Sequence, residues 1–111
     1  RFGEYPDVVA YLLEIGLVKS YLDKVFVQRV ERKENKITVQ FEKITQRLFL
    51  AQDYFKALSA TNLKAAIAEN KGLMEVVFDV RNKKDYEILE GLLIFGESLL
   101  EIKELKDGNS L

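Results

Sequence analysis

The chain is 111 residues long, with 17 Lys and Arg against 18 Asp and Glu, a formal net charge of -1, and no Cys or His. The length favours a single domain over residues 1–111, and the balanced charge argues against a bulk nucleic-acid binder while leaving room for a local basic patch. The missing Cys and His remove thiolate nucleophiles, disulfides and the commonest general base and metal ligand, so we expect no catalytic residue, cofactor or metal site.

The first predicted element is a helix that follows a short entry turn. Pro6 suits the first helical position, where its missing N–H costs nothing, and apolar residues recur at helical spacing over Val8–Leu22. A second apolar stripe comprises Leu13, Leu17 and Tyr21. This wide surface predicts either a broad core face or a groove for a partner, and Gly16 in its middle would let another backbone approach closely.

A β-hairpin is predicted next, over Val25–Phe41, around a turn at residues 34–36. Its second strand alternates apolar and polar residues, as a half-buried strand should, with Ile37 on the apolar face. In its first strand Val25 and Val27 share one face but Val30 falls on the other, which a bulge would reconcile, although the sequence does not place it. Asn35 suits a left-handed turn position.

Positive charge gathers on this hairpin and shortly after it, within residues 29–47. The candidate basic patch comprises Arg29, Arg32, Lys33 and Lys36. It predicts a contact with DNA phosphates or with an acidic protein surface. The alternative is a solvated hairpin whose charges deter edge-to-edge aggregation, which the lack of interleaved aromatic residues favours.

A middle helix is predicted from Thr45, a plausible N-cap, to about Ser59. Its expected apolar stripe comprises Leu48, Ala51, Phe55 and Leu58. In the alternative, Ile44–Leu50 extends the preceding strand and the helix begins at Ala51.

A second hairpin, Leu63–Val80, echoes the first, because both turns contain the sequence Glu-Asn-Lys. Apolar residues from Met74 to Val80 alternate onto one face. We expect the two hairpins to join in one antiparallel sheet whose apolar face carries Ile37, Val39, Phe41, Met74, Val76 and Phe78.

The last predicted helix runs from Lys83 to about Leu105, with Asn82 as its N-cap and Asp85 as the acidic partner. One side of this helix is apolar and should pack on the sheet, and the other is acidic. The candidate interaction site on the acidic side comprises Glu90, Ile94, Glu97 and Glu101. Ile94 is expected to be exposed there, which predicts a docking ridge for a basic partner, or else a solvated face with one stray isoleucine.

Together these elements predict an α+β fold of order α-ββ-α-ββ-α, with two hairpins in a small antiparallel sheet packed by three helices. No run is long and apolar enough to cross a membrane. No Gly-x-x-x-x-Gly-Lys-Ser/Thr phosphate loop occurs, and the chain begins at Arg1 rather than Met, so we expect a fragment of a longer protein.

The N-terminal sequence Arg1-Phe2-Gly3-x-x-Pro6 leads directly into the apolar helix and then the first hairpin. This order resembles the C-terminal domain of bacterial transcription-repair coupling factor, and the resemblance covers essentially the whole chain. In that family the full-length protein is a cytoplasmic, ATP-driven DNA translocase. It removes stalled RNA polymerase and recruits the nucleotide excision repair proteins.

The resemblance implies that this chain is a regulatory domain rather than an enzyme. Its partner would be the UvrB-like module upstream in the same protein, and docking there would mask the surface that recruits UvrA. Contacts with DNA, ATP, UvrA and RNA polymerase would belong to the full-length protein. The alternative from the residues themselves is a small nucleic-acid-binding α+β module that uses the basic hairpin 29–47.

Overall fold

The computed structural model describes residues 7–109, with the side chains of residues 16–106, so the N-terminal motif and the first part of the apolar stripe lie outside it. The elements in chain order are helix α1 (Asp7–Lys24), strands β1 (Val27–Lys33) and β2 (Lys36–Phe41), helices α2 (Thr45–Leu48) and α3 (Ala51–Ser59), strands β3 (Lys64–Asn70) and β4 (Leu73–Asp79), and helix α4 (Asp85–Asn109). The predicted α+β fold is confirmed, with the middle helix divided in two.

The two hairpins join in one antiparallel sheet, as predicted, in the order β1-β2-β4-β3. β2 and β4 pair at its centre, where Val39 lies opposite Val76 and Ile37 opposite Phe78. Since directly paired residues share a face, the apolar sides of both hairpins point the same way. The turn at Lys71 and Gly72 has positive φ at both residues, as the tightest hairpin turns require.

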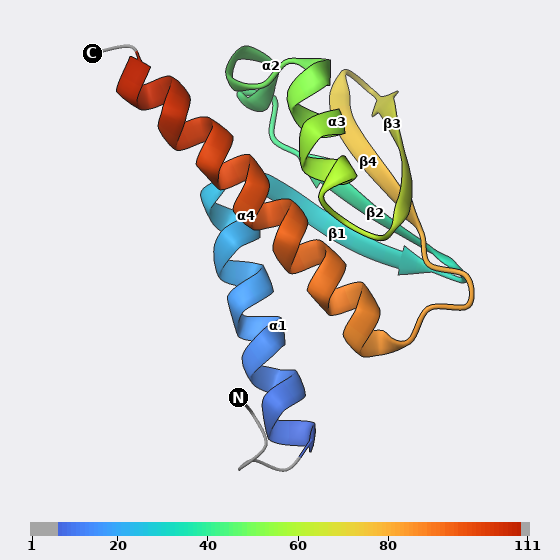
Figure 1. Ribbon diagram of the computed structural model, residues 1–111. Helices are drawn as coiled ribbons and strands as arrows, with labels where there is room; N and C mark the ends of the chain where they lie inside the picture. The colour runs from blue at the N-terminus through green and yellow to red at the C-terminus, as the bar shows by residue number, and fades with distance from the viewer. Residues whose placement is uncertain (1–6, 110–111) are drawn as a thin grey trace.

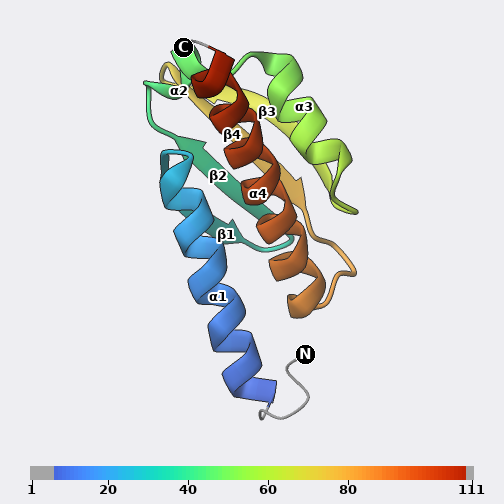
Figure 2. The ribbon, with the colours of Figure 1, turned by 60° about the vertical axis from the view of Figure 1, so that its left-hand side comes forward.

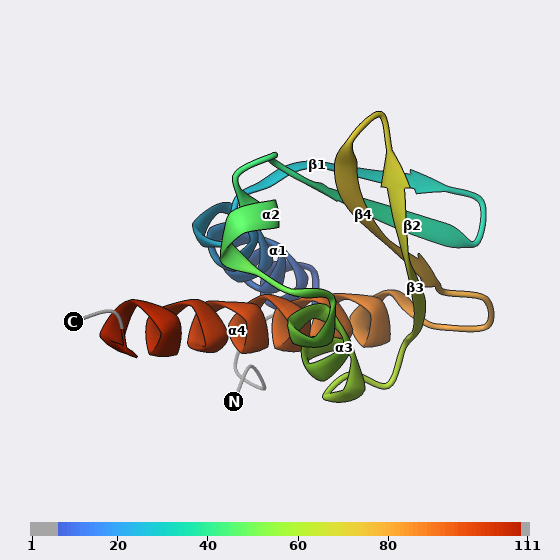
Figure 3. The ribbon, with the colours of Figure 1, turned by 90° about the horizontal axis from the view of Figure 1, so that it is seen from above.

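The helices α1, α3 and α4 lie on one side of this sheet and leave the other side uncovered (Figures 1 and 3). Phe95 of α4 packs edge-on against Phe41 of β2 and Phe78 of β4, with ring centroids 6.2 and 5.3 Å apart. Tyr54 of α3 adds a further edge-on contact to Phe41 at 5.3 Å. All four rings are fully buried, so this cluster is where the two hairpins, α3 and α4 meet.

The expected irregularity in the first strand is present. The pairing of β1 with β2 shifts register between Val27 and Arg29, which is a bulge. It brings Val30 opposite the buried Val39, on the same face as Val27. Val30 is nevertheless 47% exposed, because β1 is the edge strand at this side of the sheet.

Helices α1 and α4 lie side by side across the sheet (Figure 2). The glycine that permits their approach is Gly96 on α4, because a Cβ there would lie 3.0 Å from Cβ of Tyr21. Gly16, the candidate from the sequence, is exposed with nothing within 4 Å of an added Cβ. Leu17 beside it is also exposed, so the apolar surface of α1 is uncovered at this position.

The middle of the chain departs from the prediction. The single helix Thr45–Ser59 is wrong, because Leu50 is extended and separates α2 from α3. The alternative places the start of α3 correctly at Ala51, but α2 replaces the predicted strand. Thr45 lies inside α2 and is not its cap, since its hydroxyl donates back to the carbonyl of Glu42 at 2.7 Å.

The buried face of α3 is also rotated from the predicted stripe. Tyr54, Ala57 and Leu58 are buried, whereas Phe55 is 57% exposed. The buried face therefore keeps Leu58 from the predicted stripe, and Tyr54, which lies beside that stripe, is buried in place of Phe55.

Two expected turn assignments also change. Asn82 has a positive φ of 64° and lies before α4 as a left-handed residue, so it does not cap the helix. The carboxylate of Glu87 instead accepts the Lys84 N–H at 3.0 Å. In the first hairpin, the left-handed residue is Glu34, with φ of 56°, and not Asn35.

We predict that Phe78→Ala lowers the free energy of unfolding by about 3–5 kcal/mol, because it leaves a cavity beneath Phe95 at the centre of the core. Urea denaturation followed by circular dichroism measures the change. Phe55→Ala is the matched control, since the exposed ring should contribute less than about 1 kcal/mol. Equal losses in the two variants would contradict this account of the core.

Candidate functional site

The acidic side of α4 is present as predicted. Residues spaced by three and four along a helix share a face, so Glu90, Ile94, Glu97 and Glu101 fall within about a quarter of its circumference. We call these four residues the acidic ridge. The three glutamates are exposed, but Ile94 is only partly exposed, which corrects the expectation that it faces water.

Ile94 is partly covered because it borders a shallow hollow of about 210 Å³. The lining residues are Asn62, Leu63, Lys83, Tyr86, Glu87, Glu90, Gly91 and Ile94. Leu63 packs directly over Gly91, where an added Cβ would lie 2.4 Å from its Cδ1. Tyr86 is 57% exposed at the rim. The acidic ridge thus borders a hollow of mixed lining, in which Ile94 and Tyr86 are the apolar side chains that reach the surface. The sequence pattern alone did not show this hollow.

The candidate basic patch does not form one surface. Arg29 lies on the uncovered face of the sheet and pairs with Glu31 at 2.7 Å. Arg32 pairs with the buried Ile37 and therefore lies on the helix side of the sheet. Its guanidinium is 3.5 Å from the carboxylate of Asp85 at the start of α4. Lys33 and Lys36 share the uncovered face with Arg29 and are directly paired at the end of the hairpin, so Arg32 is the member of the patch that is separated from the others.

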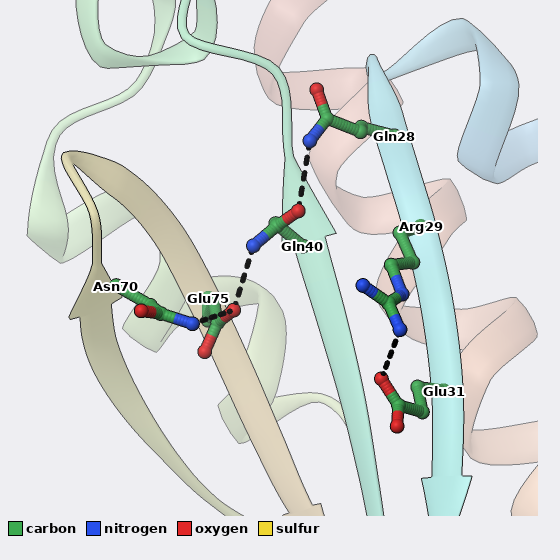
Figure 4. Close-up of polar contacts among 6 residues, drawn as sticks. All are labelled: Gln28, Arg29, Glu31, Gln40, Asn70 and Glu75. Atoms are coloured by element: carbon green, nitrogen blue, oxygen red, sulfur yellow. Dashed lines mark hydrogen bonds and ion pairs between the residues drawn. The ribbon is translucent and has the colours of Figure 1, made fainter.

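The uncovered face of the sheet carries a row of hydrogen bonds that crosses all four strands (Figure 4). Gln28 donates to Gln40, which donates to Glu75, at 2.8 Å each, and Asn70 donates to the same carboxylate oxygen at 3.3 Å. These side chains use one another as hydrogen-bond partners across a face that also carries the partly buried Leu73 and Val77. We call this row the amide ladder.

Comparison with known proteins adds a finding that geometry alone cannot give. A model of the TRCF domain matches residues 1–51. A crystal structure of the C-terminal domain of a transcription-repair coupling factor is 92% identical over 96% of this chain, with a TM-score of 0.90. The chain belongs to the transcription-repair coupling factor family. It spans 66% of the crystallised protein, and the comparison with curated proteins gave no match.

The described part of this coupling-factor domain contains no cluster of three or more acidic residues placed to hold a metal ion. No helix within residues 7–109 is long and apolar enough to cross a membrane.

One buried charge was not anticipated from the sequence. Asp53, with a side chain only 12% exposed, accepts hydrogen bonds from the Leu50 N–H at 2.8 Å and from Lys106 Nζ at 2.5 Å. Lys106 also donates to the carbonyl of Leu48 at 3.0 Å and lies over the ring of Phe49. This contact, the Asp53–Lys106 link, fastens the junction of α2 and α3 to the last turns of α4.

The ionisation of this link follows from its surroundings. Burial raises the pKa of Asp53, but the hydrogen bonds from Lys106 and Leu50 and the nearby lysine charges outweigh it, so the pKa lies below its ordinary 3.8. Beside it, burial raises the pKa of Tyr54, an effect that the Thr45 side chain reduces. The Tyr54 hydroxyl is buried without a hydrogen bond that satisfies ordinary geometry.

We predict that Asp53→Asn lowers the free energy of unfolding by about 1–3 kcal/mol at pH 7, because it weakens a buried, charge-assisted pair. A carboxyl group with a lowered pKa stabilises the fold at neutral pH, and this contribution is lost as pH falls from 3.8 through the folded-state pKa. The difference in the free energy of unfolding between wild type and Asp53→Asn should therefore be smaller below pH 3.8 than at pH 7, and urea denaturation at both pH values measures it.

The matched control is Glu104→Gln on the exposed side of α4, which should stay within about 0.5 kcal/mol of wild type. If Asp53→Asn lowers the free energy of unfolding by the same amount at both pH values, the loss of the carboxylate charge is not the cause of the destabilisation.

Proposed function

We propose that this domain regulates a longer transcription-repair coupling factor by docking on the UvrB-like module of the same protein. Docking there covers the surface that recruits UvrA, and release uncovers it. The family membership of the chain supports this role. In the same proposal the full-length protein works in the cytoplasm, translocates on DNA with ATP, and removes stalled RNA polymerase for nucleotide excision repair.

The acidic ridge is the docking face in this proposal. The observation that supports it is the position of the partly exposed Ile94 and the exposed Tyr86 among the exposed glutamates of this face. Interfaces between proteins place a small desolvated centre inside a polar rim. The rim charges steer the partner and give specificity at modest affinity, which suits a contact that must open.

The chemistry of the chain supports a binding role over an enzymatic one. Its sequence has no nucleotide-binding phosphate loop, and it lacks the residues that activate nucleophiles most often. ATP hydrolysis is therefore assigned to other parts of the longer protein. The alternative of a nucleic-acid module built on the whole hairpin 29–47 loses support, because Arg29 and Arg32 lie on opposite faces of the sheet.

We predict that Glu97→Lys combined with Glu101→Lys in the full-length protein raises its affinity for UvrA by up to about tenfold, because weaker docking leaves the recruiting surface open more often. Both positions are exposed, so the fold should be unchanged. A binding titration with UvrA measures the effect. Ile94→Asp should act the same way, with thermal melting to check that this partly buried site still folds.

The matched control reverses two exposed acids away from the ridge, Asp23→Lys and Glu42→Lys, and should leave UvrA affinity unchanged. A second comparison reverses Arg32 and Lys33 to glutamate. Unchanged affinity in the ridge variant, together with a gain in this last variant, would move the docking face to the hairpin.

A further inference from the structure

One end of the sheet gathers positive charge from segments that are far apart in the sequence. Four directly paired residues form a row across the sheet. In strand order they are Lys33 on β1, Lys36 on β2, Asp79 on β4 and Lys64 on β3. Directly paired residues share a face, and the adjacent Ile37 is buried on the helix side. The row of three lysines and one aspartate therefore lies on the uncovered face, at the end of all four strands.

The loop from β4 to α4 extends this row. The Val80 N–H donates to the carbonyl of Asn35 at 2.8 Å, which ties the loop to the turn of the first hairpin. Figures 1 and 3 both show the hairpin turn lying beside this loop. The loop carries Arg81 and Lys83, and we call Lys33, Lys36, Lys64, Arg81 and Lys83 the basic end of the sheet.

The basic end borders a hollow of about 370 Å³ with an entirely polar lining. The lining residues are Asn62, Lys64, Asp79, Arg81, Asn82 and Lys83. Asp79 accepts a hydrogen bond from the Arg81 N–H at 3.0 Å, which holds the loop against the strand. A polar hollow rimmed by cations fits an anion better than an apolar side chain.

The pairing of Lys33 with Lys36 also destabilises the sheet. Lys33 and Lys36 lie directly opposite, with Cα atoms about 5 Å apart as for any paired residues, and like charges at that position destabilise a sheet. A bound anion would remove this repulsion.

We propose that the basic end binds the phosphodiester backbone of duplex DNA. From Lys33 to Lys64 the row crosses three strand spacings, about 14 Å, and a duplex offers about one negative charge per 1.7 Å of its axis. An acidic protein surface is the less suitable partner, because the six residues that line the hollow are all polar or charged and supply no apolar side chain for the centre of a protein interface. The hollow of this site adjoins the hollow beside the acidic ridge, because Asn62 and Lys83 line both. The lysine row itself lies on the uncovered face of the sheet, so this proposal goes beyond the docking function.

The test is a titration of the 111-residue chain into a fluorescently labelled 20-base-pair duplex, followed by anisotropy over a range of salt concentrations. The variant combines Lys36→Gln, Lys64→Gln and Arg81→Gln. We expect its affinity to fall at least about tenfold and the slope of log K against log salt to become shallower by about 3, because each lost phosphate contact removes about 0.9. The control combines Lys19→Gln, Lys43→Gln and Lys71→Gln, which removes the same charge from exposed sites elsewhere.

Several outcomes would overturn the proposal. They are no binding by wild type at low salt, an equal loss in the control, or competition by polyglutamate at concentrations comparable to unlabelled duplex. Lys33→Gln gives an independent check, because removal of the repulsion should raise the melting temperature by about 1–3 °C while weakening DNA binding. A Lys33→Gln protein with unchanged DNA affinity would also count against the site.

Discussion

The contact of Phe95 with Phe41 and Phe78 joins α4 to both hairpins at the centre of the core. Each hairpin alone would be a marginal two-stranded unit with one apolar face. Pairing of β2 with β4 puts both apolar faces on one side, and Phe95 then covers the strand junction. Once α4 is fixed there, its partners follow, with α1 packed beside Gly96 and the junction of α2 and α3 held by the Asp53–Lys106 link. The opposite face has no such cluster and carries the amide ladder instead.

Most of this architecture could be read from the sequence, because its elements have strong local periods. The alternation from Ile37 to Phe41 and the apolar spacing of α4 each repeat often enough to specify type and face. The division of the middle helix could not be read, since no proline or glycine occurs between Thr45 and Ser59. Its cause is tertiary, because the extended Leu50 donates its N–H to Asp53, whose charge is balanced by a lysine 53 residues away.

The candidate sites also could be predicted from the sequence only in part. Glu90 and Glu101 lie on one helix, so helical spacing alone predicted that they share a face. The partly buried position of Ile94 depends on its hollow, which Leu63 helps to line from a distant loop. The candidate basic patch failed for the opposite reason, since neighbours along a strand point to opposite faces and a charge count along the chain ignores this. Lys64 lies beside the hairpin lysines only because of the strand order, which the sequence does not display.

The position of the first and last helices has a mechanical consequence. α1 and α4 run side by side, with the start of α1 and the end of α4 toward opposite ends of the molecule (Figures 1 and 2). Tension applied between the ends of the chain would load the contact of α1 with α4 in shear, and the four strands, which lie between these helices in sequence, would be outside the direct path of the force. Such tension would therefore separate α1 first, with the sheet, α3 and α4 still packed around Phe95.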